Sequence, residues 1–175
     1  MKRPFLALLL LFALWTPTRA SELVLPKDTR VQVFFSPRGG CTEACVAAIN
    51  AARSEVKVMA YSFTSAPIAG ALKAAHDRGV QVLVILDKSQ LTERYSGLGY
   101  IARAGIPVWV DSAHAIFHDK VIIVDQHVLL QGSFNLTKSA EFDNAENMLV
   151  IENRELAEFY LANWEIHRSH SAKMN

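Results

Sequence analysis

Four residues with the right chemistry for phosphate lie between positions 118 and 135, in the stretch HDKVIIVDQHVLLQGSFN. His118 and Lys120 are two positions apart, so on an extended chain their side chains point to the same side. Lysine supplies a compact positive charge, while Ser133 and Asn135 supply neutral hydrogen-bonding groups. A histidine that titrates near neutral pH can attack as a nucleophile or donate a proton. The group predicts that the protein binds a phosphate anion and reacts at phosphorus.

The same stretch is expected to form a β-hairpin around a two-residue turn at positions 126–127. In that register Lys120 lies opposite Ser133, and His118 lies opposite Asn135. A shift of one residue would send these side chains to opposite faces of the sheet. The register is therefore a sharp structural prediction.

No stretch of the sequence resembles the dense oxygen ligand set that a magnesium or calcium nuclease needs. We therefore predict that the reaction depends on fixed side-chain charges, with no metal and no other cofactor. EDTA should leave the activity intact.

The first twenty residues have the pattern of a secretory signal peptide. Lys2 and Arg3 precede an apolar run over residues 5–15, and the segment ends at the small residue Ala20. A membrane anchor is the alternative, but the run is shorter than the roughly 20 residues that span a bilayer. The expected mature chain, residues 21–175, is a single domain that is periplasmic or secreted, without stable membrane association.

The composition of the chain sets further limits. The formal net charge is +1, and it becomes slightly acidic without the basic signal segment, unlike that of a protein that coats DNA. Cys41 and Cys45 are the only cysteines. Export would allow a disulfide between them, while two unpaired small residues in a helix are an equally good interpretation. Two cysteines alone do not make a structural zinc site.

Strand and helix patterns alternate along the chain, without a linker or a repeat. Alternation followed by a hairpin predicts an α/β domain in which a mixed β-sheet is sandwiched between helices. Besides the hairpin, strands are expected at 31–36, 55–62, 80–87, 108–111 and 147–151, and helices at 42–53, 67–77, 93–103 and 154–167.

A family resemblance rests on the pattern His118-x-Lys120-x4-Asp125-x6-Gly132-Ser133-x-Asn135. This spacing resembles the HKD motif of the phospholipase D superfamily, and the likeness extends over nearly all of residues 21–175. It is strongest to short bacterial endonucleases that carry one such motif per chain. The resemblance implies the phospholipase D-like fold.

In that family two HKD motifs build one site, and this chain has one, because no other histidine is followed by lysine two positions on. The resemblance thus implies a homodimer with the two-fold axis through the site. His118 would attack phosphorus and form a phosphohistidine, and His118 of the partner subunit would protonate the leaving oxygen. Both copies of Lys120 and Asn135 would hold the phosphate oxygens.

Three further residues receive roles from the same resemblance. Glu146 occupies the position of a family glutamate that hydrogen-bonds the histidine ring and thereby sets its tautomer; an ordinary surface glutamate is the alternative. Asp125 matches the aspartate of the motif, but its position at the hairpin end suits a structural role. Ser133 would contact phosphate or support Glu146.

The remaining histidines and the glycine turn at 38–40 receive weaker assignments. His114 and His127 are expected in surface loops. His167 and His170 end the last helix, where positive charge suits the helix dipole. The glycine turn before the first helix is a weak candidate for phosphate binding.

These observations predict a metal-independent endonuclease that hydrolyses DNA without sequence preference, with RNA as an open second substrate. No helix carries the side chains of a groove-reading element. A phospholipase or phosphatidyl-transfer enzyme that acts on lipid is the main alternative. A DNA-binding or uptake component with an inactive site is the third.

Overall fold

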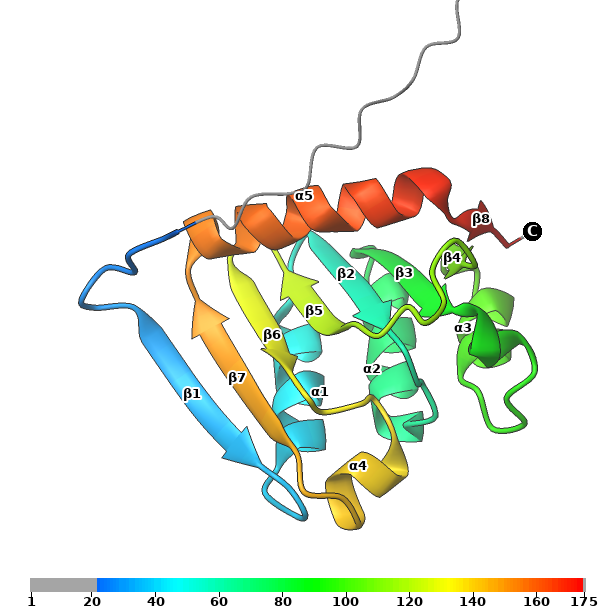
Figure 1. The fold of residues 1–175 in the computed structure, drawn as a ribbon, viewed down its shortest axis with the longest axis horizontal. Helices are drawn as coiled ribbons and strands as arrows, with labels where there is room; N and C mark the ends of the chain where they lie inside the picture. Colours follow the sequence, from blue (N-terminus) through cyan, green and yellow to red (C-terminus); the bar gives the residue numbers. More distant parts are fainter. Residues whose placement is uncertain (1–21, 175) are drawn as a thin grey trace, which may run out of the picture.

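Eight strands form one mixed sheet in residues 22–174, the part of the chain that the computed structural model describes (Figure 1). The signal peptide expected at residues 1–20 lies outside the described residues. The elements are β1 (Arg30–Phe35), α1 (Cys41–Ala51), β2 (Glu55–Ala60), α2 (Ala66–Asp77), β3 (Gln81–Asp87), the 3-10 helix η1 (Lys88–Leu91), α3 (Leu98–Arg103), β4 (Val108–Asp111), β5 (Lys120–Val124), β6 (Val128–Gly132), α4 (Lys138–Phe142), β7 (Asn147–Glu152), α5 (Arg154–His170) and β8 (Ala172–Lys173).

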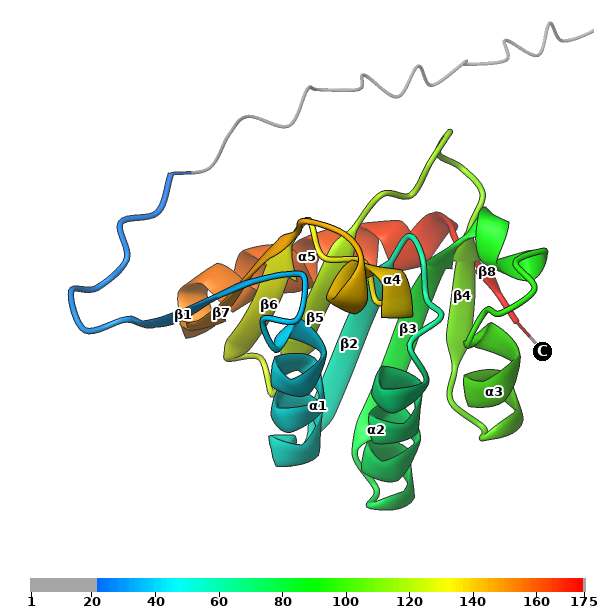
Figure 2. The ribbon, with the colours of Figure 1, turned by 90° about the horizontal axis from the view of Figure 1, so that it is seen from below.

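The strand order is β1-β7-β6-β5-β2-β3-β4-β8. Strands β2, β3 and β4 run parallel, and the other neighbouring pairs are antiparallel. Helices α1, α2 and α3 cover one face of the sheet, and α5 crosses the other face (Figure 2). This arrangement confirms the predicted α/β fold with a mixed sheet between helices.

Two hydrophobic clusters lie on the two faces of the sheet. Neighbouring residues of β2 serve both, because successive side chains of a strand point to opposite faces. Val58 packs with α1 and α2, whereas Met59 packs with α5. The fully buried Trp164 of α5 donates its indole N–H to the carbonyl of Val58 at 3.3 Å. The central strands are therefore apolar on both sides, as their sequences indicate.

Most predicted elements are present with small shifts of their ends, but the helix expected at 93–103 begins only at Leu98. The cause is a close contact at Gly97, whose N–H donates to the carbonyl of Phe63 at 2.7 Å. A Cβ at Gly97 would lie 2.7 Å from the Phe63 ring. The preceding residues are therefore held in a loop. The short elements α4 and β8 give no periodic signal and were not predicted.

The predicted hairpin register is wrong by one residue. Val124 pairs with Val128, so the turn holds three residues, 125–127, instead of two. Asp125 does not pair with β6, because its N–H donates to the carbonyl of Glu55 at the start of β2. Asp125 and Gln126 both have positive φ, 50° and 56°. Lys120 consequently does not pair with Ser133, which lies just beyond the end of β6 at Gly132.

The two cysteines are free and buried on α1. The thiol of Cys45 lies 3.6 Å from the sulfur of Met148. Burial, aided by the charge of Glu141, raises the pKa of Cys41 to about 11. Of the two interpretations left open by the sequence, the structure has the unpaired one, and neither thiol is a ready nucleophile.

None of the helices in residues 22–174 is long and apolar enough to cross a membrane.

Candidate active site

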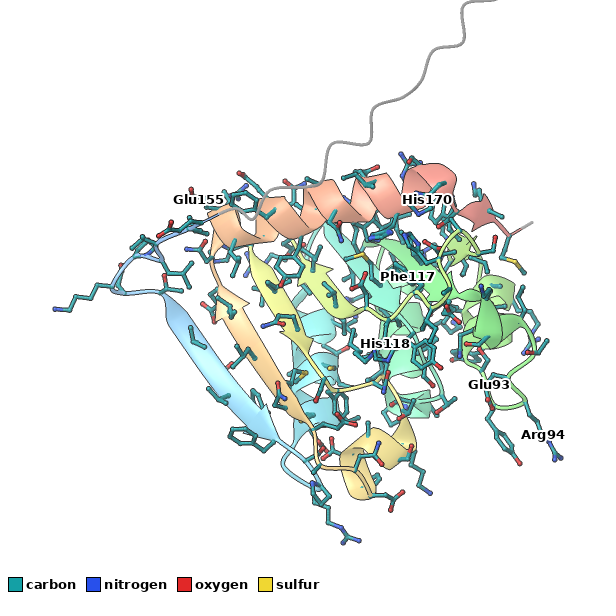
Figure 3. All side chains as sticks on the ribbon, in the orientation of Figure 1. Glu93, Arg94, Phe117, His118, Glu155 and His170 are labelled. Atoms are coloured by element: carbon teal, nitrogen blue, oxygen red, sulfur yellow. The ribbon has the colours of Figure 1, made fainter. Side chains whose placement is uncertain are left out.

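The candidate site lies at one edge of the sheet, where β2 ends and β5 and β7 begin (Figure 1). His118 is exposed in the loop before β5, and Lys120 is the first residue of β5, paired with Ala60 at the end of β2. Figure 3 shows His118 on this loop. Open α/β sheets commonly hold their ligands at the carboxyl ends of parallel strands, and this location fits that rule.

Tyr61 contacts both the backbone and the side chains of the segment that carries His118 and Lys120. Its N–H donates to the carbonyl of Asp119 at 2.8 Å, and its ring centre lies 4.8 Å from that of His118. The ammonium of Lys120 lies 5.2 Å from the same ring and donates to the carbonyl of His118 at 2.8 Å. Sequence reasoning missed Tyr61, although its place directly after β2 puts it next to β5.

The charge on Lys120 is held in a partly buried position. Burial lowers the pKa of Lys120, and the nearby carboxylates of Asp119 and Glu146 oppose this shift only in part. A bound phosphate would add the missing negative charge. The site is therefore prepared to gain electrostatic energy from an anion.

A glycine lets the chain turn from β6 towards Glu146. A Cβ on Gly132 would collide with the carbonyl of Asn147, so no other residue fits there without a shift of β7. The same carbonyl accepts the N–H of Ser133 at 3.0 Å. The hydroxyl of Ser133 then donates to Glu146 Oε2 at 2.6 Å. The structure thus brings Ser133 to Glu146, one of the two roles expected for it.

Glu146 is anchored through its backbone and side chain. Its N–H donates to the hydroxyl of Ser36 at 3.1 Å, and its Oε1 accepts from the amide of Asn144 at 3.1 Å. Within the described protomer its hydrogen bonds do not reach His118. The expected contact between Glu146 and a histidine ring stays a prediction.

Asn135 has an unused hydrogen-bonding group. Its Oδ1 is buried and has no hydrogen-bond partner among the described residues. The loop that carries it is held against the segment before α2, because the carbonyl of Leu136 accepts N–H groups from Thr64 and Ser65 at 3.0 and 2.9 Å. A phosphate oxygen can only accept, so it would take a hydrogen bond from the Nδ2 donor of this amide, while the buried Oδ1 acceptor would need a donor.

Asp125 lies at the other end of β5, about 17 Å from Lys120 by the rise of a strand. Its carboxylate accepts the backbone N–H groups of Arg53, Ser54 and Glu55 at 2.9, 2.8 and 3.0 Å. Burial alone would raise the pKa of Asp125, but these bonds and the Ser54 hydroxyl hold it below its usual range. The carboxylate therefore caps the start of β2 and does not meet the phosphate residues.

The glycine turn at 38–40 and the start of α1 already have a carboxylate partner. The buried carboxylate of Glu141 accepts from Gly40 at 3.1 Å and from Thr42 at 2.7 Å. This acid from α4 already caps the N-terminus of α1.

A cluster that sequence reasoning missed consists of Asp111, His114, His167 and His170. Their potential ligand atoms all lie within 4.8 Å of one another. The sequence predicted a loop position for His114 and dipole partners for the other two, without bringing them together. The signal that was available is spacing: Asp111 and His114, like His167 and His170, are three residues apart.

Comparison with known proteins identifies the family. Residues 45–166 match the family model described as cardiolipin synthase, PLD-like domain. A protein named phospholipase D from Rickettsia felis is 43% identical over 144 residues, which cover 82% of this chain and 70% of that protein. The mitochondrial cardiolipin hydrolase of Mus musculus is 36% identical over 118 residues, covering 67% of this chain and 53% of the enzyme.

Solved structures give the same result. Nuc from Salmonella typhimurium, described as a phospholipase D family member, superposes with a TM-score of 0.80 and 41% identity over 85% of this chain and 99% of Nuc. NucT from Helicobacter pylori, at 24% identity and a TM-score of 0.78, supports the fold.

The chain therefore belongs to the phospholipase D superfamily, whose members are phosphodiesterases. More narrowly, it is a single-motif member of that superfamily and a hydrolase of phosphodiester bonds, with the sheet and the helices of Nuc.

Proposed function

We propose that the protein is a metal-independent endonuclease that cleaves DNA without sequence preference, at a site shared by two copies of the chain. The observation that carries the proposal is the single exposed His118 beside Lys120 at an open sheet edge. Hydrolysis through a covalent intermediate needs a nucleophile and an acid, and one protomer has one histidine in this position. A two-fold axis through the site supplies the second.

The proposed reaction has two steps. In the first, a ring nitrogen of His118 attacks phosphorus, the bond to the leaving oxygen breaks, and His118 of the partner subunit donates a proton to that oxygen. In the second, the partner's His118 takes a proton from water, the hydroxide attacks phosphorus, and the phosphohistidine bond breaks. Lys120 and Asn135 from both copies stabilise the charge on the phosphate oxygens.

The two histidines need opposite protonation states, and a bound diester favours one shared extra proton on the pair. In the proposed mechanism Glu146, whose carboxylate accepts a hydrogen bond from Ser133, stabilises a protonated ring. We expect a bell-shaped dependence of the rate on pH whose limits belong to the pair.

The likeness to Nuc, which the chain covers almost completely, supports the nuclease assignment. The exposed histidine also suits a long polymer, which must reach the site from the surface. We further propose that the chain acts after export, in the periplasm or outside the cell, as its N-terminal pattern indicates.

The second candidate is a lipid phosphodiesterase. It is favoured by the names of two relatives, phospholipase D and mitochondrial cardiolipin hydrolase. Supercoiled plasmid and phosphatidylcholine vesicles, offered separately in EDTA, distinguish the two. Nicking of the plasmid without release of headgroup is the expected result, and the opposite pattern overturns the nuclease assignment.

Subunit mixing tests the shared site. Wild-type protein and an inactive His118→Asn variant are mixed in equal amounts, allowed to exchange subunits, and assayed. If each site needs both histidines, mixed dimers are inactive. The mixture then has about one quarter of the activity of the same total amount of wild-type protein. About one half remains if each chain works alone, and that result would contradict the proposal.

A further inference from the structure

Four side chains outside the phosphate site converge on one point. Asp111 ends β4, His114 follows in the loop towards His118, and His167 and His170 lie on the last turns of α5. Figure 3 shows His170 at the end of α5, with Phe117 and His118 on the loop below. The residue spacing puts both helix histidines on one face, since residues three apart are neighbours on a helix.

The carboxylate of Asp111 is fully buried at the centre of this cluster. One of its oxygens, Oδ2, lies 3.0 Å from His114 Nδ1, 3.0 Å from His170 Nε2 and 3.6 Å from His167 Nδ1. Its other oxygen already accepts backbone N–H groups from Ala113 and His114. His114 Nδ1 also lies 3.1 Å from that second oxygen, so three ring nitrogens and two backbone N–H groups share one carboxylate, more donors than its four lone pairs can accept.

One ring nitrogen of the cluster indeed has no hydrogen-bond partner among the described residues. Nδ1 of His167 is buried and has no hydrogen-bond partner within residues 22–174. The three rings pack against one another, with centres 5.2 to 5.4 Å apart. Three imidazoles around one buried acid are poorly explained as packing, because each ring would prefer water to a shared acceptor.

The same geometry suits a metal ion. In a tetrahedral zinc site with ligand bonds near 2.0 Å, neighbouring ligand atoms are about 3.3 Å apart. The three distances from Oδ2 lie around that value. The widest separation in the cluster, 4.8 Å, would have to close by about 1.5 Å. The side chains of His114 and His170 are 45% and 32% exposed, so both have room to move.

The surroundings resemble those of a built metal site. The second ring nitrogen of His167 faces the carboxylate of Asp119 at 3.9 Å, as an outer carboxylate commonly orients a metal-bound histidine. The C-terminus of α5 adds negative potential. Phe117 packs on His167 with ring centres 5.0 Å apart and shields that side.

We propose that Asp111, His114, His167 and His170 bind a divalent transition-metal ion of the zinc class. Imidazole and carboxylate suit such an ion, and four protein ligands make a closed structural site rather than a catalytic one. The ion would join the end of α5 to the loop that carries His118, and so position that loop. It takes no part in the reaction at phosphorus, and the proposal does not depend on the substrate.

Metal binding is measured on chelator-treated full chain with Zn²⁺ by calorimetry and with Co²⁺ by absorption. We expect one ion per chain and the spectrum of tetrahedral cobalt. His114→Gln and His170→Gln, which alter exposed side chains, should weaken binding by at least about 100-fold. His127→Gln, an exposed histidine of the hairpin turn, is the matched control and should bind like the wild type.

Wild-type protein without affinity for Zn²⁺ at micromolar concentration, or equal binding by the two ligand variants, would overturn the proposal. An octahedral cobalt spectrum would overturn the four-ligand site. Hydrogen exchange gives an independent measure: Zn²⁺ should protect residues 112–119 in the wild type but not in His170→Gln.

Two controls separate this inference from the proposed function. His118→Asn should lose cleavage and keep the metal. If prolonged chelation lowers cleavage, Zn²⁺ should restore it and Mg²⁺ should not. Restoration by Mg²⁺ alone would contradict the metal-independent reaction and leave the binding result standing.

Discussion

The two ends of strand β5 carry residues of one sequence motif but differ in how completely their side chains are bonded. At the Asp125 end, three backbone N–H groups and a hydroxyl surround the carboxylate. At the other end His118 is exposed, and Asn135 retains a buried oxygen without a partner. A saturated group has no capacity left for a ligand. The comparison indicates a structural role for the Asp125 end of the motif, and it agrees with the proposal that the chemistry takes place at the His118 end.

The largest expected difference in activity is between two variants that replace a histidine at opposite ends of the hairpin. We expect His118→Asn to lower kcat for plasmid cleavage by at least about 10⁴-fold, as removal of a nucleophile does. His127→Asn, in the turn beside Asp125, should keep full activity. Both should melt near the wild-type temperature, because both side chains are exposed. Comparable losses from the two variants would erase the distinction.

Lys120 should rank second, since its charge stabilises the phosphate. Lys120→Met should lower kcat by about 10³-fold. Lys138→Met removes an exposed lysine from the start of α4 and should cost less than about tenfold, through weaker backbone attraction alone. Single-turnover rates on a short duplex measure both. A small effect at Lys120 would mean that its charge does not contact the reacting phosphate.

Replacing Asp125 should lower the stability of the protein and leave its activity nearly unchanged. Asp125→Asn weakens a carboxylate that accepts four hydrogen bonds, so we expect the free energy of unfolding to fall by about 2–3 kcal/mol. The kcat of the folded variant should stay within about threefold of the wild type. Urea denaturation and cleavage rates measure the two quantities, with Asp28→Asn in an exposed turn as the control. A large loss of kcat at full stability would assign Asp125 to the chemistry.

Glu146 should have a smaller effect with a distinct signature. Glu146→Gln should lower kcat by about tenfold, because the histidine loses an orienting carboxylate. It should also move the acidic limb of the pH profile to lower pH, since a carboxylate stabilises the protonated ring. A merely structural Glu146 would change kcat without moving that limb.

The smallest expected effect is the pH dependence of the Asp125 contribution. The folded pKa of Asp125 lies below its unfolded value, so its stabilisation is complete above about pH 4 and is lost as the pH falls through the folded value. The difference in unfolding free energy between wild type and Asp125→Asn should therefore shrink in acid. A difference that grows below pH 4 would reverse the assigned sign.

Local pattern was sufficient for much of the fold. The alternating strands and helices and the mixed sheet could be predicted, because they depend on periodicity and residue type within short windows. The phosphate-site residues stay a prediction. The motif spacing also identified the family, which the comparisons confirm. The hairpin register could not be predicted, because the turn length depends on a contact between Asp125 and Glu55 from a distant strand.

Although the predicted hairpin register is wrong, tertiary contacts still position the candidate site residues. His118 lies before β5 and Ser133 lies after β6, so neither is bound by strand pairing. Tyr61 positions the first, and Asn147 positions the second through a turn that only Gly132 allows. Contacts of this kind join residues far apart in sequence, and no local pattern encodes them.

The sequence by itself determined most of the elements, the family and the candidate residues for phosphate, because these follow from local spacing. The tertiary structure decided which end of the motif is saturated, and it brought Asp111 together with three histidines from the other end of the domain. Side chains from β4 and α5 meet only when the sheet and its covering helix have packed, so their chemistry appears only in the folded chain.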